Sequence, residues 1–241
     1  MPFSSGSVIR SIDDLNGPMG KIEAVLNTGR ADARYAALVC HPHPLGGGTL
    51  HNKVVYHAMK VFSGLGLPVL RFNFRGVGLS EGVHDHGPGE LNDARAALDW
   101  LDSNLHLPVL VAGFSFGAYI ALQLGCGDPL VKGLVGLGVP HRAEGRSYGY
   151  EFLERCTQPK LFISGTEDQF GPRAAMNPIL KHAAEPKEIV WIDGAEHFFQ
   201  GVPSSPGAKL GQMQDILRAW VTRSFDLGLP SSAKVGIAGA S

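Results

Sequence analysis

Short apolar runs alternate with amphipathic stretches along most of the chain. Seven runs rich in apolar and β-branched residues, bounded by glycine, proline or polar clusters, predict strands at residues 21–26, 35–40, 68–74, 108–112, 131–139, 160–164 and 188–192. The first of them alternates apolar and polar positions, as an edge or antiparallel strand does. By contrast, the runs VLVAG and LVGLGV are almost wholly apolar, as buried parallel strands are. This pattern predicts an α/β protein with a mostly parallel sheet and helices on both faces.

Helical periodicity separates these runs. One amphipathic face lies in residues 90–105, and a second lies in residues 210–221, where the apolar stripe consists of Leu210, Met213, Ile216, Leu217, Trp220 and Val221. Both stripes predict helices that pack onto the sheet. We expect a single domain over residues 1–227. Residues 228–241 are small and aperiodic, which predicts a flexible tail.

Composition and charge exclude several classes of protein. Hydrophobic residues make up 44% of the chain and charged residues 18%, which is typical of a globular protein. The net charge of −1, from 21 basic and 22 acidic residues, gives no electrostatic reason to expect a nucleic-acid or membrane partner. Residues 107–127 carry no charge, but Pro108, Gly113 and Gly117 interrupt them, so we interpret them as a strand followed by a helix.

Cysteine usage and the N-terminal segment bear on the cellular compartment. The three cysteines are odd in number and show no CxxC spacing, so we expect neither a structural zinc site nor a disulfide framework. A reducing compartment is then the default. The first residues lack the apolar core of a secretory signal. We therefore expect a cytoplasmic protein.

The pattern Gly-x-Ser-x-Gly, which can mark a nucleophilic serine, occurs twice. Ser115 in GFSFG follows the apolar run LPVLVA and precedes the helical run AYIALQL, so it lies at a predicted strand–turn–helix junction. Ser147 in GRSYG follows a polar loop and has no strand before it. A serine nucleophile needs the strained turn between strand and helix, where glycines leave room for the backbone. Ser115 is therefore the candidate nucleophile, and Ser147 is interpreted as a loop serine.

A neutral serine hydroxyl is a weak nucleophile and needs a histidine as its base. When the serine lies on a strand–turn–helix junction, the acid and then the histidine are expected after it along the chain. His197 lies in a loop after the last predicted strand and before the last helix. Of the other histidines after residue 139, His141 precedes any plausible acid and His182 lies in a helical run, where we expect it to face solvent. His197 is therefore the candidate base.

The acid is predicted from its place at a strand end. Asp168 follows the run LFISG in the turn GTED, at the carboxyl end of a strand, where functional loops of an open α/β sheet collect. Glu167 is its neighbour and Asp193 its chief rival. Asp193 lies only four residues before His197, so we expect it to serve turn geometry, and we expect Glu196 to be solvated. Asp168 is the candidate that orients His197.

Two backbone amides are expected to stabilise the developing oxyanion. One is that of Phe116, directly after the nucleophile, and the other belongs to the loop HPHPLGGG at residues 41–48. Prolines have no N–H, so His43 is favoured and Leu45 is the alternative. The paired histidines at 41, 43, 84 and 86 raise the possibility of a metal site. Without an accompanying HExxH motif or carboxylate-rich helix, we predict no metal.

Taken together, HPHPLGGG, RFNFRGVGLSEG, GFSFGA and GAEHFF resemble the α/β-hydrolase superfamily. The sequence is similar to small bacterial hydrolases related to dienelactone hydrolases and carboxylesterases, over about residues 17–227. The resemblance implies an α/β-hydrolase fold and a triad of Ser115, Asp168 and His197. It also implies that Arg75, Gly76, Gly78 and Ser80 belong to a loop that supports the floor of the site. Serine replaces the cysteine of dienelactone hydrolases, which argues against a lactone substrate.

The expected function is that of a serine hydrolase acting on small or short-chain carboxylic esters, without a cofactor. The short segment between residues 139 and 160 leaves no room for a large lid domain. A thioesterase or small peptidase with the same triad is an alternative, as is a binding protein that kept the fold and lost catalysis. The sequence does not indicate an oligomeric state. Residues expected to line the substrate site, from position alone, are Leu45, Tyr148, Phe170 and Phe198.

Overall fold

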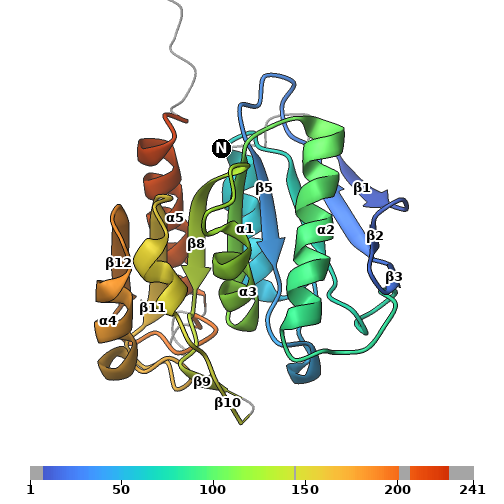
Figure 1. The fold of residues 1–241 in the computed structure, drawn as a ribbon. Helices are drawn as coiled ribbons and strands as arrows, with labels where there is room; N and C mark the ends of the chain where they lie inside the picture. Colours follow the sequence, from blue (N-terminus) through green and yellow to red (C-terminus); the bar gives the residue numbers. More distant parts are fainter. Residues whose placement is uncertain (1–7, 144, 201–206, 228–241) are drawn as a thin grey trace, which may run out of the picture.

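The computed structural model describes residues 8–143, 145–200 and 207–227. Among these residues, a central sheet of eight strands runs in the order β1-β4-β6-β5-β7-β8-β11-β12 (Figure 1). The strands are β1 (Ile9–Ile12), β4 (Ala24–Asn27), β6 (Val69–Phe72), β5 (Ala36–Cys40), β7 (Val109–Phe114), β8 (Val131–Leu137), β11 (Lys160–Gly165) and β12 (Lys187–Ile192). All seven predicted strands are found within a few residues of their expected bounds.

The sheet is mostly parallel, which confirms the predicted fold class. Only the pairings of β1 with β4 and of β4 with β6 are antiparallel; every other neighbouring pair is parallel. The strand expected at residues 21–26 is antiparallel as predicted, but it is not at the edge, because β1 pairs along its outer side. Strand β1 was not predicted. Its sequence IRSI is short and mostly exposed, so it carries little apolar signal.

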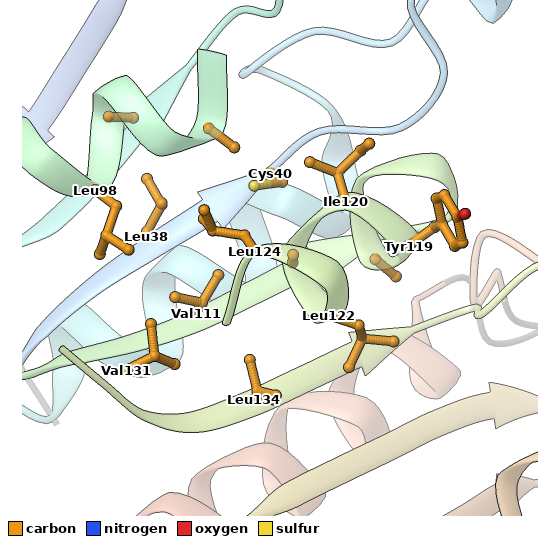
Figure 2. Close-up of a cluster of buried hydrophobic side chains, with 14 of the residues drawn as sticks. Leu38, Cys40, Leu98, Val111, Tyr119, Ile120, Leu122, Leu124, Val131 and Leu134 are labelled. Atoms are coloured by element: carbon orange, nitrogen blue, oxygen red, sulfur yellow. The ribbon is translucent and has the colours of Figure 1, made fainter. Parts of the chain in front are cut away.

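Helices cover both faces of the sheet and bury a separate apolar cluster on each. On one face lie α1 (Lys53–Gly64) and α5 (Ala208–Ser224), and on the other lie α2 (Pro88–Leu105), α3 (Phe116–Gly125) and α4 (Arg173–His182) (Figure 1). Strand β7 alternates between the two faces. Val111, shown in Figure 2, and Val109 join the cluster under α2 and α3. Leu110 and Ala112 join the cluster on the other face. This two-sided burial explains why the central strands are apolar at nearly every position.

No large lid interrupts the fold in the described part of the chain. The described residues between β8 and β11 form only the hairpin of β9 (Arg142–Ala143) and β10 (Arg146–Ser147) and the short 3-10 helix η2 (Glu151–Arg155). Near the N-terminus, β2 (Asn16–Gly17) and β3 (Gly20–Lys21) form a second small hairpin. Within the described ranges, no helix has the length and apolar character needed to cross a membrane.

The loop after β6 is tied to helix α2. Both the backbone amide and the guanidinium of Arg75 donate to the carboxylate of Asp93, with an ion-pair distance of 2.7 Å, and both side chains are buried. Ser80 donates its hydroxyl to the carbonyl of Asn73 at 2.7 Å. These contacts fix the segment that leads to His84, which lies toward the carboxyl end of the sheet.

The structure contains one disulfide, although the odd number and the spacing of the cysteines predicted no disulfide framework. Cys126 and Cys156 are bonded, with their Cα atoms 5.0 Å apart. Cys126 caps the C-terminus of α3, and Cys156 caps the C-terminus of η2. The two cysteines are 30 positions apart in the chain. Their approach depends on where β8 and the following hairpin return the chain, so residue spacing could not reveal it. The third cysteine, Cys40, is a buried free thiol.

Candidate active site

Ser115 stands at a sharp turn between β7 and α3, as the sequence predicts. Its backbone has φ 57° and ψ −123°, a conformation that residues other than glycine rarely adopt. The flanking glycines are required by close approach of the backbone. A Cβ on Gly113 would lie 2.0 Å from the carbonyl oxygen of Gly117, and one on Gly117 would lie 2.3 Å from that of His41. The turn can therefore form only with glycine at both positions.

Three side chains predicted from separate parts of the chain meet at this turn. Nε2 of His197 lies 2.9 Å from Oγ of Ser115, and Nδ1 of His197 lies 2.9 Å from Oδ2 of Asp168. The exposed fractions of Ser115, His197 and Asp168 are 8%, 2% and 2%. A carboxylate on Nδ1 places the imidazole proton there and leaves the lone pair of Nε2 facing the serine hydroxyl. This geometry suits proton transfer from the serine to the histidine.

Backbone groups hold the carboxylate and the histidine loop in place. Oδ1 of Asp168 accepts hydrogen bonds from the amides of Phe170 and Gly171, at 2.9 and 3.1 Å. The loop that carries His197 packs directly against the end of β11, where a Cβ on Gly165 would lie 2.0 Å from the carbonyl oxygen of Ala195. Glycine at position 165 thus permits the two loops to approach, which brings the acid and the histidine within contact.

The structure places the rival candidates for the nucleophile and the acid elsewhere. Ser147 is exposed in strand β10. Asp193 is an exposed turn residue, and Glu167 is exposed as well. Glu196 is not simply solvated as expected: its carboxylate accepts the amides of Phe198 and Gln200, at 3.0 and 2.7 Å, and so shapes the loop that carries the histidine.

The rival histidines have other surroundings. His182 is exposed at the end of α4, as expected. The backbone amide of His141 donates to the carbonyl of Phe170 at 2.7 Å. That bond joins the segment after β8 to the loop that carries the acid.

Two of the four residues expected at the substrate site contact the candidate base. The rings of Phe170 and Phe198 lie edge-on to the His197 ring, with centroids 4.7 and 5.3 Å away. Phe198 is 38% exposed, and Leu45 is 71% exposed. Tyr148, in contrast, is buried, and its ring packs on that of Tyr119 in α3. Phe170, Phe198 and the neighbouring Phe114 therefore give the candidate base an apolar surround.

The loop HPHPLGGG lies against the turn that holds the nucleophile. It forms the 3-10 helix η1 (Pro44–Gly46), and the ring of His43 packs on that of Phe116 with centroids 5.1 Å apart. The amide of Leu45 donates to Nδ1 of His43 at 3.2 Å. The amides of the three glycines after Leu45 donate to backbone carbonyls of the same loop. These bonds engage the amides of Leu45 and of the three glycines within the loop itself.

His41 is the internal support of this loop. Its Nδ1–H donates to the carbonyl of Pro42 at 2.6 Å, and its Nε2 accepts the amide of Phe74 at 3.0 Å. Burial lowers the pKa of His41 to about 4, so the ring is neutral near neutral pH. Burial likewise raises the pKa of the Cys40 thiol, which disfavours a thiolate next to the site.

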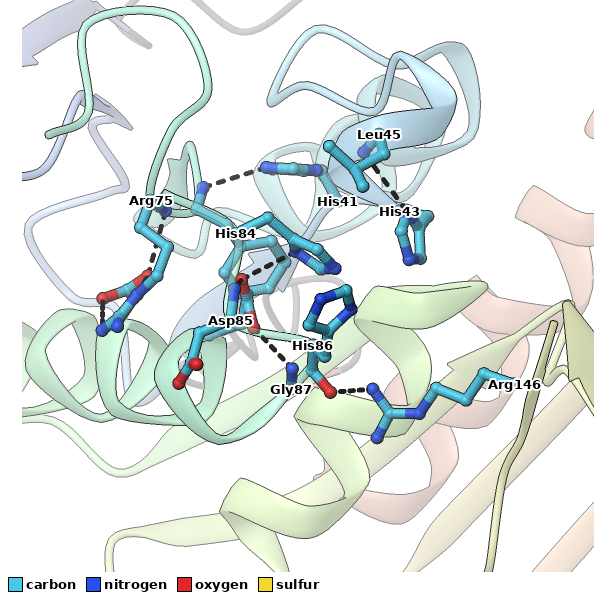
Figure 3. Close-up of polar contacts among 12 residues, drawn as sticks. His41, His43, Leu45, Arg75, His84, Asp85, His86, Gly87 and Arg146 are labelled. Carbon is cyan, nitrogen blue, oxygen red and sulfur yellow. Dashed lines mark hydrogen bonds and ion pairs between the residues drawn. The ribbon is translucent and has the colours of Figure 1, made fainter. Parts of the chain in front are cut away.

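The histidines at 43, 84 and 86 do come together, which residue spacing left open. The His84 ring lies 4.7 Å from that of His43 and 4.8 Å from that of His86 (Figure 3). Even so, the described residues hold no group of three histidine, cysteine or acidic side chains arranged to bind a metal ion. Sequence reasoning did not find the partner of His84, which is Glu90 of α2. A signal was present, because Glu90 stands three residues after the residue that caps this helix.

Comparison with known proteins shows the family to which the chain belongs. Residues 36–223 match the family model described as "Alpha/beta hydrolase domain". An uncharacterized protein of Rickettsia prowazekii is 38% identical over an alignment of 192 residues, and the match covers 77% of this chain and 80% of that protein. The chain belongs to the α/β-hydrolase family.

Solved structures show the same relationship. An alpha-beta serine hydrolase homologue from Coxiella burnetii is 32% identical with a TM-score of 0.76, covering 88% of this chain and 96% of its own. A serine hydrolase without a lid from Xanthomonas campestris is 30% identical with a TM-score of 0.75, covering 95% of this chain and 98% of its own. The fold and these relatives support hydrolase activity.

Proposed function

We propose that the protein is a serine hydrolase that cleaves small or short-chain carboxylic esters through an acyl-enzyme intermediate. The observation that carries the proposal is the unbroken series of contacts from the Ser115 hydroxyl through the His197 ring to the Asp168 carboxylate, 2.9 Å at each step. A serine hydroxyl becomes an effective nucleophile when a base removes its proton and a carboxylate orients that base.

The geometry supports the following sequence of steps. Oγ of Ser115 attacks the ester carbonyl carbon while its proton passes to Nε2 of His197. The amides of Phe116 and His43 stabilise the negative charge on the carbonyl oxygen. When the tetrahedral intermediate collapses, His197 protonates the leaving alcohol. Water then gives its proton to His197 and attacks the acyl carbon, which releases the acid and restores Ser115.

The surroundings of His197 favour small, uncharged groups on the substrate. The rings of Phe114, Phe170 and Phe198 contact it, so the neighbouring surface is apolar. No lid occurs among the described residues to enclose a long acyl chain. The same apparatus cleaves thioesters and amides, and a panel of matched esters, thioesters and amides of graded chain length distinguishes the three.

The backbone at Ser115 argues against a binding protein that has lost catalysis. A serine held at φ 57° and ψ −123° is strained, and such strain persists in proteins where a function requires it. In addition, the histidine and carboxylate beside it are both almost fully buried. A protein that kept the fold only for binding does not need a serine, a histidine and a carboxylate that are buried and aligned for proton transfer.

Labelling with a fluorophosphonate probe tests the proposal. We expect covalent labelling of the wild type and of Ser147→Ala, none of Ser115→Ala, and p-nitrophenyl acetate hydrolysis that follows the same pattern. Treatment with a chelator should leave turnover unchanged. A folded wild-type protein that resists the probe, or labelling that survives Ser115→Ala, would overturn the proposal. Loss of labelling in Ser147→Ala would show that the second Gly-x-Ser-x-Gly holds the nucleophile.

A further inference from the structure

A second histidine–carboxylate pair lies beside the candidate oxyanion loop. Nδ1 of His84 is 2.8 Å from Oε1 of Glu90, and the two side chains are 5% and 0% exposed. The carboxylate of Glu90 also accepts the amides of Asp85 and Gly87, at 2.8 and 2.6 Å. Burial acts to raise the pKa of Glu90, but these two amides and His84 outweigh it, so the net pKa is lowered. Glu90 is therefore an anchored, ionised partner for His84.

The other ring nitrogen of His84 has no such partner. Nε2 is buried and accepts or donates no hydrogen bond among the described residues. The ring packs on that of His43, with centroids 4.7 Å apart (Figure 3). It also packs on that of Phe116, with centroids 5.8 Å apart. These are the two residues whose amides are the candidate oxyanion donors, so His84 lies on the oxyanion side of the site. A buried polar atom left unsatisfied there calls for a functional explanation.

The β9–β10 hairpin, which contains the second Gly-x-Ser-x-Gly, holds the loop of His84 and His86 in position. Arg146 of β10 donates to the carbonyl of His86 (Figure 3). Its guanidinium lies over the rings of Tyr119 and Tyr148, 5.3 and 5.1 Å from their centroids. These contacts commit Arg146 to the protein itself and give it a positioning role.

Oε1 of Glu90 lies 2.8 Å from Nδ1 of His84, much as Oδ2 of Asp168 lies 2.9 Å from Nδ1 of His197, although only the Asp168 contact has the alignment of a hydrogen bond. A carboxylate beside Nδ1 places the imidazole proton on that nitrogen, so Nε2 presents a lone pair. Resting on the serine hydrolase function proposed above, we propose that Nε2 of His84 accepts a hydrogen bond from a hydroxyl group of the substrate. The preferred substrates are then hydroxy esters, with the hydroxyl on either the acyl or the alcohol part. His84 acts as a specificity-determining residue, and Glu90 positions it.

Matched ester pairs test the proposal. One arm uses methyl esters of hydroxy acids with the hydroxyl on the first, second or third carbon after the carbonyl, each against the ester without the hydroxyl. The other arm uses monoesters of short diols against esters of the corresponding alcohols. We expect kcat/KM to favour the hydroxylated member of at least one pair by roughly tenfold. The arm in which the preference occurs identifies the part of the substrate that carries the hydroxyl.

Two variants at the same position separate recognition from structure. His84→Asn keeps an N–H toward Glu90 but has no acceptor at the Nε2 position, so the preference should fall to about onefold. His84→Gln places an amide oxygen near that position and should restore part of the preference. A merely structural role would lower kcat/KM for both members of a pair and leave their ratio unchanged. An unchanged ratio in His84→Asn, or no preference in the wild type, overturns the proposal.

Binding to the Ser115→Ala protein keeps this test independent of catalysis. NMR titration should show tighter binding of the hydroxylated ester than of its matched partner by a similar factor, and His84→Asn in the same background should remove the difference. Equal affinities overturn the hydroxy-ester proposal whether or not the wild type hydrolyses esters. Failure of fluorophosphonate labelling with a binding preference intact would instead overturn the serine hydrolase function alone. If His84→Asn fails to fold, the wild-type ratio and the Ser115→Ala affinities still decide.

Discussion

The carbonyl oxygen of His41 lies so close to Gly117 that a Cβ on the glycine would be 2.3 Å away from it. The end of β5 and the start of α3 are thereby pressed together at the candidate nucleophile. This contact sets the distance between the loop that carries His43 and the amide of Phe116. Backbone packing, together with the buried His41 ring that supports the loop, thus positions the two candidate oxyanion donors.

Gly117→Ala should therefore lower both stability and activity. The added methyl group forces the backbone of His41 and the turn apart, at a cost of about 1–3 kcal/mol in the free energy of unfolding. Gly211→Ala in α5 is the matched control, because a Cβ there meets no atom within 4 Å. It should stabilise the helix by about 0.5–1 kcal/mol. Urea unfolding of both variants measures the difference, and equal stabilities would contradict the close approach.

Asp168→Asn should reduce kcat for ester hydrolysis by about 10⁴-fold while the protein stays folded. The amide oxygen can still accept the amides of Phe170 and Gly171, so the amide NH₂ faces His197. That arrangement favours the tautomer with the proton on Nε2, which cannot accept the serine proton. Steady-state kinetics with p-nitrophenyl acetate measures the loss. Asp193→Asn, at an exposed turn in the same region, should retain full activity, and a comparable loss there would identify it as the acid.

His41 should make stability fall as the solution is acidified. Its folded-state pKa of about 4 lies below its ordinary value of 6.5, so between these values the unfolded chain binds more protons. Its stabilising contribution is complete above pH 6.5 and is lost as the pH falls toward 4. His41→Gln keeps an acceptor for the Phe74 amide but does not titrate. Urea unfolding at several pH values should show a shallower decline in the variant, and parallel curves would contradict the prediction.

The buried ion pair between Arg75 and Asp93 should be strongly sensitive to loss of one partner. Asp93→Ala leaves a buried guanidinium without its carboxylate and should cost about 3–5 kcal/mol in the free energy of unfolding. Glu188→Ala removes the partner of Arg223 in an ion pair of similar length whose side chains are 60% and 45% exposed, and should cost at most about 1 kcal/mol. Chemical unfolding compares the two. Similar losses would mean that the Arg75 pair is not effectively buried.

Local patterns determined most of the sheet and the nature of the turn at Ser115. An apolar run bounded by glycine or proline specifies a strand wherever it lies, and two glycines between a strand and a helix specify a tight turn. The same reasoning missed β1, whose four residues are mostly exposed, and α1, which lies between two glycine-rich loops. Chain order also singled out Asp168 and His197, because strand ends of a parallel sheet gather at one edge.

Only the tertiary structure decided which of these residues meet. Ser115 and His197 are 82 positions apart, and their 2.9 Å contact depends on β7, β8, β11 and β12 being successive neighbours in the sheet. The pairing of Cys126 with Cys156 and that of His84 with Glu90 depend likewise on where helices and loops return. A sequence pattern encodes the local preference of each segment. The contacts between segments follow from strand order and from close backbone approach, which no short stretch of residues carries by itself.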